Sequence, residues 1–296
     1  MKKDIIVVTG GAGFVGSNLI KSLLKYKTFK IISIDNYSSG KKLNHIKNKR
    51  VKYLKSHTKE IEKVLNKCKK KIFTIFHFGE FARIFQSFKK FDECFLSNIV
   101  GSNAVFKFCL KNKIKLIYSA TSATLGNNGN DKNLSPYAFN KAKNLELLQN
   151  FKDWFGFSYE VIYFYNVYGP KQISKGDMAT VIGIFEEQTK NGKELTIVKP
   201  GTQTRKFTHI NDTIDTCIEA WKKNRNRHYS ISSKKNYSII DVAKMFGGKK
   251  RYLPKRKGER YESTLRNKNL SNQIYKRFGK IELKNYIYSF IQNLKN

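Results

Sequence analysis

The sequence predicts an α/β fold in which a doubly wound parallel sheet carries a smaller C-terminal α/β lobe. Three observations predict it. Short β-branched runs alternate with amphipathic segments, the first run ends in glycines, and the regular alternation stops after Gly169. At 296 residues, 40% of them hydrophobic, the chain is long enough to bury a large core. Strands that alternate with helices join by right-handed crossovers, so helices should cover both faces of the sheet.

The alternation covers the first 169 residues. Strands are expected at residues 4–10, 30–35, 51–54, 72–78, 114–122 and 158–169. Helices are expected between them at residues 14–26, 61–68, 98–113 and 135–155.

Shorter elements are expected after Gly169. Residues 170–178 read as a loop and residues 195–210 as two strands around a turn. The helices of this half are expected at residues 179–192, 213–223, 238–247 and 283–294. We expect residues 167–296 to form the smaller lobe, placed over the C-terminal edge of the sheet.

The composition limits the possible partners. Fifty-eight Lys and Arg against 22 Asp and Glu give a net charge of +36, which attracts polyanions. These charges are spread along the whole chain, so nucleic-acid binding is not favoured, although an anionic small substrate would be attracted. The four cysteines show no C-x-x-C spacing, which predicts neither a zinc site nor a disulfide framework. No apolar run approaches the roughly 20 residues that span a bilayer, and no signal-peptide cleavage site is evident, so we expect no membrane association and a cytoplasmic protein.

Three glycines lie between the first strand and the first helix. In "VTGGAGFVGSNL", Gly10 permits a tight turn, Gly13 lets the backbone approach a pyrophosphate, and Gly16 lets the helix pack close to the sheet. The helix N-terminus adds unpaired N–H groups and a positive dipole end. The pattern predicts a Rossmann-type NAD-binding domain at residues 1–166, rejoined by a strand and helix around residues 207–233.

Asp35 ends the second strand and is followed by Asn36. A carboxylate at this position accepts hydrogen bonds from a ribose diol and repels a 2′-phosphate. The cofactor is therefore expected to be NAD rather than NADP.

Tyr137 and Lys141 share one face of a predicted helix that Ser135 caps and Pro136 begins. The pKa of a free tyrosine is about 10. A nearby ammonium and an oxidised nicotinamide would stabilise the phenolate and lower that pKa. The phenolate would then take a proton from a sugar hydroxyl while a hydride leaves the same carbon. Ser122, at the end of the preceding strand, would hydrogen-bond the same sugar oxygen. A tyrosine stacked on a lysine stem is the structural alternative.

The chain resembles, end to end, the extended short-chain dehydrogenase/reductase superfamily, in particular its NAD-dependent nucleotide-sugar epimerases and dehydratases. The resemblance rests on "TGGAGFVGS", "IDN", "HFGE", "SAT", "YAFNK", "NVYGP" and "TRKFTHI", in family order. It implies that Ser122, Tyr137 and Lys141 are catalytic. It implies cofactor contacts for Gly10, Gly13, Phe14, Val15, Gly16, Asp35, Asn36, Phe78, Gly79, Asn98, Tyr137 and Lys141.

The resemblance also implies the substrate contacts, which include Ser122. Asn166 corresponds to a residue that contacts the sugar diphosphate, and Arg205 and Arg256 correspond to arginines that hold its two phosphates. The planar guanidinium suits this role because it can bind phosphate oxygens in pairs. A solvated surface charge is the alternative for each arginine. His77 and His209 are interpreted as structural, and no metal is expected.

UDP-glucose 4-epimerases are the nearest general description within the superfamily. This resemblance implies oxidation of the sugar C4 by bound NAD, turnover of the keto-sugar and return of the hydride to its other face. The stretch "YNVYGPKQISKGDMATV" resembles the corresponding stretch of the ADP-heptose 6-epimerases. These enzymes use a lysine as a second base, and Lys175 is the residue of this chain that matches it. An epimerase or C4 oxidoreductase of an activated heptose is thus the alternative. A 4,6-dehydratase is less favoured, because Ala123 and Thr124 follow Ser122 where those enzymes have Asp-Glu.

Two further expectations follow from the family. Many relatives dimerise through a four-helix bundle, which residues 92–112 and 137–155 would supply here, so we expect a homodimer. The product of an epimerase would feed surface polysaccharide or glycoconjugate synthesis. A non-enzymatic nucleotide- or polyanion-binding protein on the same fold is the rival from another class, and a preserved Ser–Tyr–Lys set disfavours it.

Overall fold

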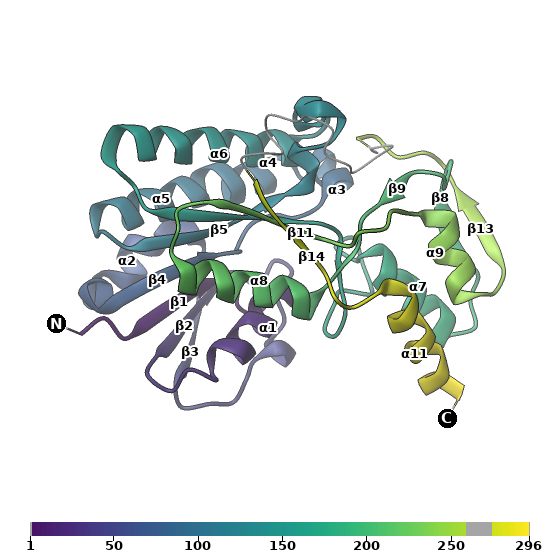
Figure 1. The fold of residues 1–296 in the computed structure, drawn as a ribbon, viewed down its shortest axis with the longest axis horizontal. Helices are drawn as coiled ribbons and strands as arrows, with labels where there is room; N and C mark the ends of the chain where they lie inside the picture. The colour runs from purple at the N-terminus through teal and green to yellow at the C-terminus, as the bar shows by residue number, and fades with distance from the viewer. Residues whose placement is uncertain (1, 259–273, 296) are drawn as a thin grey trace.

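The computed structural model describes residues 2–258 and 274–295, and an eight-stranded parallel sheet forms its centre (Figure 1). The strand order is β14-β11-β6-β5-β4-β1-β2-β3. The strands are β1 (Ile5–Thr9), β2 (Lys30–Asp35), β3 (Val51–Lys55), β4 (Ile72–His77), β5 (Lys115–Thr121), β6 (Tyr159–Phe164), β11 (His228–Ser232) and β14 (Ile274–Phe278). The order changes direction at β1, so the chain winds outward from the middle of the sheet both ways.

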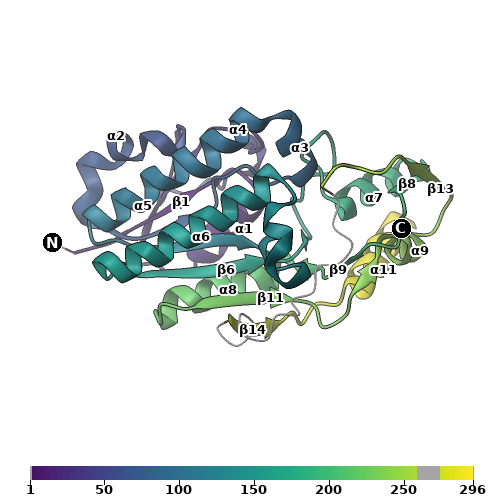
Figure 2. The same ribbon diagram turned by 90° about the horizontal axis from the view of Figure 1, so that it is seen from above.

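Helices cover both faces of this sheet (Figure 2). One face carries α1 (Phe14–Leu23) and α8 (Ile210–Lys223), and the other carries α2 (Ile61–Leu65), α5 (Ser102–Lys111) and α6 (Pro136–Phe155). Strand β1 shows why: Ile5 and Val7 pack into one hydrophobic cluster, whereas Ile6 and Val8 pack into the cluster on the opposite face. A strand that is apolar on both sides requires two covering layers.

A smaller lobe lies beyond the carboxyl ends of the strands and has its own core. Its helices are α7 (Val181–Lys190), α9 (Ile239–Phe246) and α11 (Leu283–Lys295). Its strands form two-stranded ladders: β8 (Leu195–Val198) with β13 (Lys250–Leu253), and β9 (Thr204–Arg205) with β12 (Tyr237–Ser238). A third ladder, β10 (Thr208–His209) with β7 (Val167–Tyr168), joins it to the main sheet layer.

The expected strands and helices of the first half are present with small shifts at their ends, except that the single strand expected at residues 158–169 is divided into β6 and β7, which pair in different sheets. Residues 66–71 form a 3₁₀ helix rather than continuing α2, and a π-helical turn over residues 96–101 precedes α5. Residues 195–210, expected as two strands around a turn, form β8, a turn and then two short strands, β9 and β10. Strand β8 ends at Val198, because Pro200 has no N–H to continue a ladder. The three strands do not pair with one another: β8 pairs with β13, β9 with β12 and β10 with β7.

Several short elements were not predicted. They are α3 (Ile84–Lys89), β12, β13 and β14, whereas α4 (Phe91–Phe95) overlaps the bundle helix expected at residues 92–112. Strand β14 is the clearest case, because "IYKRF" places Lys276 and Arg277 in an edge strand where charge is common and the hydrophobic pattern is weak.

A buried histidine connects β1, β4 and α5. The Thr9 hydroxyl oxygen accepts the N–H groups of Phe78 (3.1 Å) and Gly79 (3.0 Å), so its own proton is donated to Nδ1 of His77, 2.7 Å away. The protonated Nε2 of His77 then donates to Oγ of Ser102 at 2.9 Å. Burial lowers the pKa of His77 from 6.5 to about 4, so the ring is neutral near neutral pH.

Acid should therefore weaken the fold through His77. Its pKa is lower in the folded state than in the unfolded state, so its stabilising contribution is complete above pH 6.5 and is lost as the pH falls toward about 4. A shift of this size corresponds to about 3 kcal/mol of unfolding free energy. Urea unfolding between these two pH values should show a clearly smaller loss in His77→Gln than in the wild type. His45→Gln is the control at a partly exposed histidine and should keep most of the wild-type loss. An equal loss in His77→Gln and wild type would contradict this role.

Candidate active site

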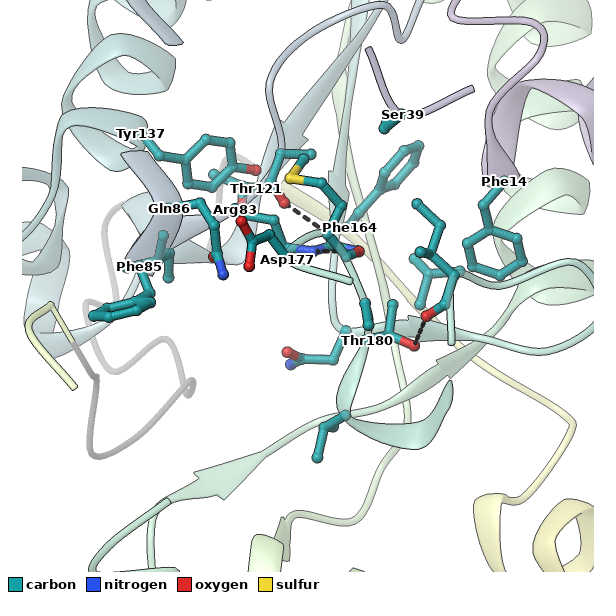
Figure 3. Close-up of a pocket in the computed structure, with 18 of the residues that line it drawn as sticks. Phe14, Ser39, Arg83, Phe85, Gln86, Thr121, Tyr137, Phe164, Asp177 and Thr180 are labelled. Atoms are coloured by element: carbon teal, nitrogen blue, oxygen red, sulfur yellow. Dashed lines mark hydrogen bonds between the residues drawn. The ribbon is translucent and has the colours of Figure 1, made fainter. Parts of the chain in front are cut away.

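One cavity of about 560 Å³ lies where the carboxyl ends of the sheet strands face the smaller lobe (Figure 3). Open α/β sheets bind ligands at this edge. The structure brings most of the predicted site residues to its wall: Gly10, Gly13, Phe14, Val15, Gly16, Asp35, Asn36, Phe78, Gly79, Ser122, Tyr137, Asn166, Arg205 and Arg256.

Two backbone turns meet at one end of this cavity. Gly10, with φ of +72°, follows β1, and Gly79 follows β4. A Cβ atom added to Gly10 would lie 2.8 Å from the Gly79 nitrogen, and one added to Gly16 would lie 2.2 Å from the Gly10 carbonyl oxygen. Only glycines allow this approach, which leaves bare backbone at the N-terminus of α1. Such a surface fits the pyrophosphate of a dinucleotide.

Asp35 lies beside this turn with its carboxylate fixed by the backbone. Its two oxygens accept the N–H groups of Ala12 (2.9 Å) and Tyr37 (2.8 Å). Burial raises the pKa of Asp35, and these two hydrogen bonds oppose the rise. The hydroxyls of a ribose diol would be further donors to this carboxylate, whereas a phosphate would be repelled. The turn and the acid together fit NAD.

Tyr137 and Ser122 reach the cavity from neighbouring elements. Ser135 caps α6 by accepting the N–H of Ala138 at 3.1 Å, which sets the position of Tyr137 in the first turn. The Tyr137 side chain lines the cavity, and Figure 3 shows it with Arg83, Gln86 and Asp177 at one end, opposite Phe14. Ser122 begins the 3₁₀ turn that follows β5 and is almost fully buried.

Lys141 lies one helical turn after Tyr137 but not on the cavity wall. Its residue surface is 3% exposed, and its ammonium donates to the backbone oxygen of Ser119 and to the carboxylate of Glu80. The ammonium also lies 4.6 Å from the centre of the Tyr118 ring. Lys141 is thus held below the surface of the site by an acidic partner that the sequence did not single out.

The structure does not bring Asn98 or Lys175 to the cavity. The Asn98 amide accepts the N–H of Phe81 at 2.7 Å and donates to its carbonyl oxygen at 2.9 Å, so its side chain holds backbone and not cofactor. The side chain of Lys175 is 71% exposed and pairs with Glu187 at 2.9 Å. The cofactor contact expected of Asn98 and the second base expected of Lys175 therefore have no support in the geometry.

The expected phosphate-binding groups lie on the smaller-lobe side of the cavity. Asn166 adopts a positive φ of 37°, which asparagine tolerates, and donates to the Lys206 carbonyl oxygen at 2.9 Å. Arg205 lies in β9 and is largely buried, and the Arg256 guanidinium lies 5.3 Å from the Phe85 ring centre. Both guanidinium groups therefore have defined surroundings, unlike solvated surface charges.

Other polar residues at or near the cavity were missed. Glu80, Arg83, Gln86, Asp177 and Gln203 line it, and the Glu80 carboxylate accepts the Lys141 ammonium. The Arg83 Nε donates to the Met178 carbonyl oxygen at 2.9 Å, which ties the end of β4 to the loop before α7. The sequence did contain a signal for Glu80 and Arg83. Both are charged, and both follow closely after the buried strand "IFTIFH", in the stretch "HFGEFAR".

Two properties of the described residues bear on other classes of function. Within residues 2–258 and 274–295, no group of three or more His, Cys, Asp or Glu side chains is placed to hold a metal ion. No described helix combines the length and apolar composition needed to span a bilayer.

Comparison with known proteins identifies relatives along the whole chain. Residues 6–232 match the model of the NAD dependent epimerase/dehydratase family. A putative UDP-glucose 4-epimerase of Methanocaldococcus jannaschii is 27% identical over 99% of both chains. An ADP-L-glycero-D-manno-heptose-6-epimerase of Brachyspira hyodysenteriae is 29% identical over 81% of this chain and 79% of its own.

One further relative is much longer than this chain, and one solved structure closely matches its fold. A dTDP-D-glucose 4,6-dehydratase of Dictyostelium discoideum is 28% identical over 81% of this chain, which spans only 60% of that relative. The crystal structure of a UDP-glucuronic acid 4-epimerase from Bacillus cereus, in complex with UDP-glucuronic acid and NAD, has a TM-score of 0.84. That enzyme is 25% identical, with 98% of this chain and 99% of the other covered.

Proposed function

Because this chain belongs to the NAD-dependent epimerase/dehydratase family, we propose that it is a nucleotide-sugar epimerase with UDP-glucose and UDP-galactose as its lead substrate pair. One observation carries the proposal. Tyr137 and Ser122 share a single cavity with the glycine turn at one end and with Arg205 and Arg256 at the other side. A cavity with a base, a dinucleotide cradle and two guanidinium groups suits a substrate that carries both a sugar and a diphosphate.

The residues of the chain divide the chemistry among them. Bound NAD supplies a reversible hydride acceptor. The Tyr137 phenolate takes the proton of the sugar hydroxyl, and the Ser122 hydroxyl donates to the same oxygen and orients it. The Lys141 ammonium, one turn along α6, stabilises the phenolate charge. After the keto-sugar has turned over, Tyr137 returns the proton and the opposite configuration results.

The diphosphate of the substrate stays bound to the protein while the keto-sugar rotates. Arg205 and Arg256 bind its oxygens, and Asn166, which also lines the cavity, is a further polar contact. Binding energy from this remote group holds the substrate while the keto-sugar is free to present its other face. The net charge of +36 favours the approach of such an anion.

The alternatives are weaker on the same geometry. An activated heptose remains the second candidate because of the relative in Brachyspira hyodysenteriae, but Lys175 pairs with Glu187 outside the cavity. Dehydration needs an acid beside the catalytic serine, and Ala123 and Thr124 supply no carboxyl group. A pure binding protein has no need of a buried lysine one turn from a phenol that lines the cavity.

Turnover of a nucleotide sugar without added cofactor tests the proposal. We expect NMR of the purified protein incubated with a panel of nucleotide sugars to show interconversion of UDP-glucose and UDP-galactose. Tyr137→Phe should lower that rate by at least about 100-fold, because a positioned acid–base group contributes 10²–10⁴. NAD binding, measured by calorimetry, should persist in this variant. The matched control Tyr288→Phe changes an exposed tyrosine of α11 and should keep the wild-type rate. Near-normal turnover in Tyr137→Phe would show that the base is another group.

We also propose that the protein is a homodimer that pairs through α4, the adjoining π-helical turn and α6. These elements lie against one another and expose large apolar side chains: Phe91, Phe95, Leu96, Val100, Phe139, Trp154 and Phe155. Exposed apolar surface of this extent marks an interaction site.

The dimer can be tested with charge. The double substitution Phe95→Glu and Val100→Glu should convert a dimer into a monomer in light scattering coupled to size exclusion, because a buried interface would have to accept two carboxylates. Leu43→Glu, at an exposed leucine of the segment after β2, is the control and should leave the mass unchanged. A monomeric wild-type protein would rule out the interface.

A further inference from the structure

Glu80 follows β4 by three residues and is the acidic partner of Lys141. We propose that Glu80 is a positioning residue of the active site, whose carboxylate keeps the Lys141 ammonium charged and fixed one helical turn from Tyr137. This inference rests on the proposed function, because it assigns a role within the same proton-transfer site.

In the described part of the chain, every hydrogen bond to the Glu80 carboxylate is donated by its partner. Its Oε1 accepts from Oγ of Ser102 (2.7 Å), the hydroxyl of Tyr118 (3.0 Å) and Nδ2 of Asn144 (3.2 Å). Its Oε2 accepts from the Lys141 ammonium. A protonated carboxyl group would have to donate one bond, and a hydroxyl that accepted it would then have no acceptor for its own proton among these contacts. The ionised carboxylate is therefore the form that the site satisfies.

Each hydrogen bond between Thr9, beside the glycine turn, and Glu80 has a defined donor and acceptor. Thr9 donates to His77, because its oxygen already accepts two backbone N–H groups, and His77 donates to Ser102. Ser102 can then only donate onward to Glu80. One chain of hydrogen bonds thus runs from the cofactor turn to the catalytic helix and ends on the carboxylate.

Other groups around Lys141 cannot replace this negative charge. Burial and the nearby Glu80 raise the pKa of Tyr118 well above 10, burial raises that of Cys94 to about 11, and burial keeps His77 neutral. Within residues 2–258 and 274–295, the ammonium donates to one further group, the Ser119 carbonyl oxygen. The side chains of Lys141 and Glu80 are 4% and 2% exposed, so water cannot take the place of the carboxylate.

The pair affects the chemistry through Lys141. Removal of one partner from a buried ion pair leaves an uncompensated charge that costs several kcal/mol, and a buried lysine relieves that cost by losing its proton. A neutral amine gives the Tyr137 phenolate no electrostatic support. Loss of Glu80 should therefore make the phenol harder to ionise through its effect on Lys141. Glu80 belongs to the cavity wall, but its side chain is only 2% exposed.

The pH dependence of turnover tests this role in the NAD-loaded protein. With UDP-glucose as substrate, the acidic limb of the rate profile in Glu80→Gln should move to higher pH by about one unit, a tenfold loss of rate on that limb. Glu160→Gln is the matched control. Glu160 is also a buried carboxylate, pairs with Lys115 at 2.9 Å and lies off the cavity, so its limb should stay at the wild-type pH. An unmoved limb in Glu80→Gln, or one moved to lower pH, would overturn the proposal.

A stability measurement decides the matter without activity. Thermal unfolding of Glu80→Gln, Lys141→Met and the double variant should show that the double variant melts above Glu80→Gln, because removing both charges avoids a lone buried ammonium. Additive losses would overturn the ion-pair role. If wild-type protein does not turn over UDP-glucose, the proposed substrate fails while this comparison still tests Glu80.

Discussion

The contact on which the site depends is the close approach of two backbone turns, at Gly10 after β1 and at Gly79 after β4. These strands are neighbours in a parallel sheet, so both turns leave it at the same edge. The Thr9 hydroxyl ties them together by accepting two N–H groups from the second turn. Because the glycines of these turns have no side chains, the N-terminus of α1 is open to a phosphate. The rest of the cavity extends from this end.

The same contact is linked to the catalytic helix. His77 and Ser102 carry hydrogen bonds from Thr9 to Glu80, which holds Lys141 in α6. Tyr137 and Lys141 belong to one helix face but have different environments, since the tyrosine lines the cavity and the lysine is buried on its carboxylate. This division suits the roles that we propose for them. A group that exchanges protons must reach the substrate, whereas a group that supplies only charge acts best where water does not screen it.

Much of this arrangement could be predicted from the chain. The glycine spacing, Asp35 and the Tyr137–Lys141 pair each combine a residue type with a position at a strand or helix end, and local sequence fixes such positions. The sequence could mark Glu80 as a candidate but could not give it a role, because its partners Ser102, Tyr118 and Lys141 come from three later elements that only the folded sheet brings together. For Asn98 and Lys175, similarity to family motifs predicted a role at the site. In the structure, the Asn98 side chain instead accepts the N–H of Phe81, and Lys175 pairs with Glu187. The short ladders of the smaller lobe were unpredictable for a similar reason, since two-residue strands carry no periodic pattern.

The central claim is that the cradle formed by the two glycine turns holds NAD with its reactive ring facing Tyr137. A crystal structure of the protein with NAD and UDP tests this most directly. The account predicts the pyrophosphate on the backbone of the turn at Gly10, the adenosine ribose hydrogen-bonded to Asp35, and the nicotinamide beside the Tyr137 hydroxyl. A dinucleotide bound elsewhere, or a nicotinamide out of reach of Tyr137, would contradict it.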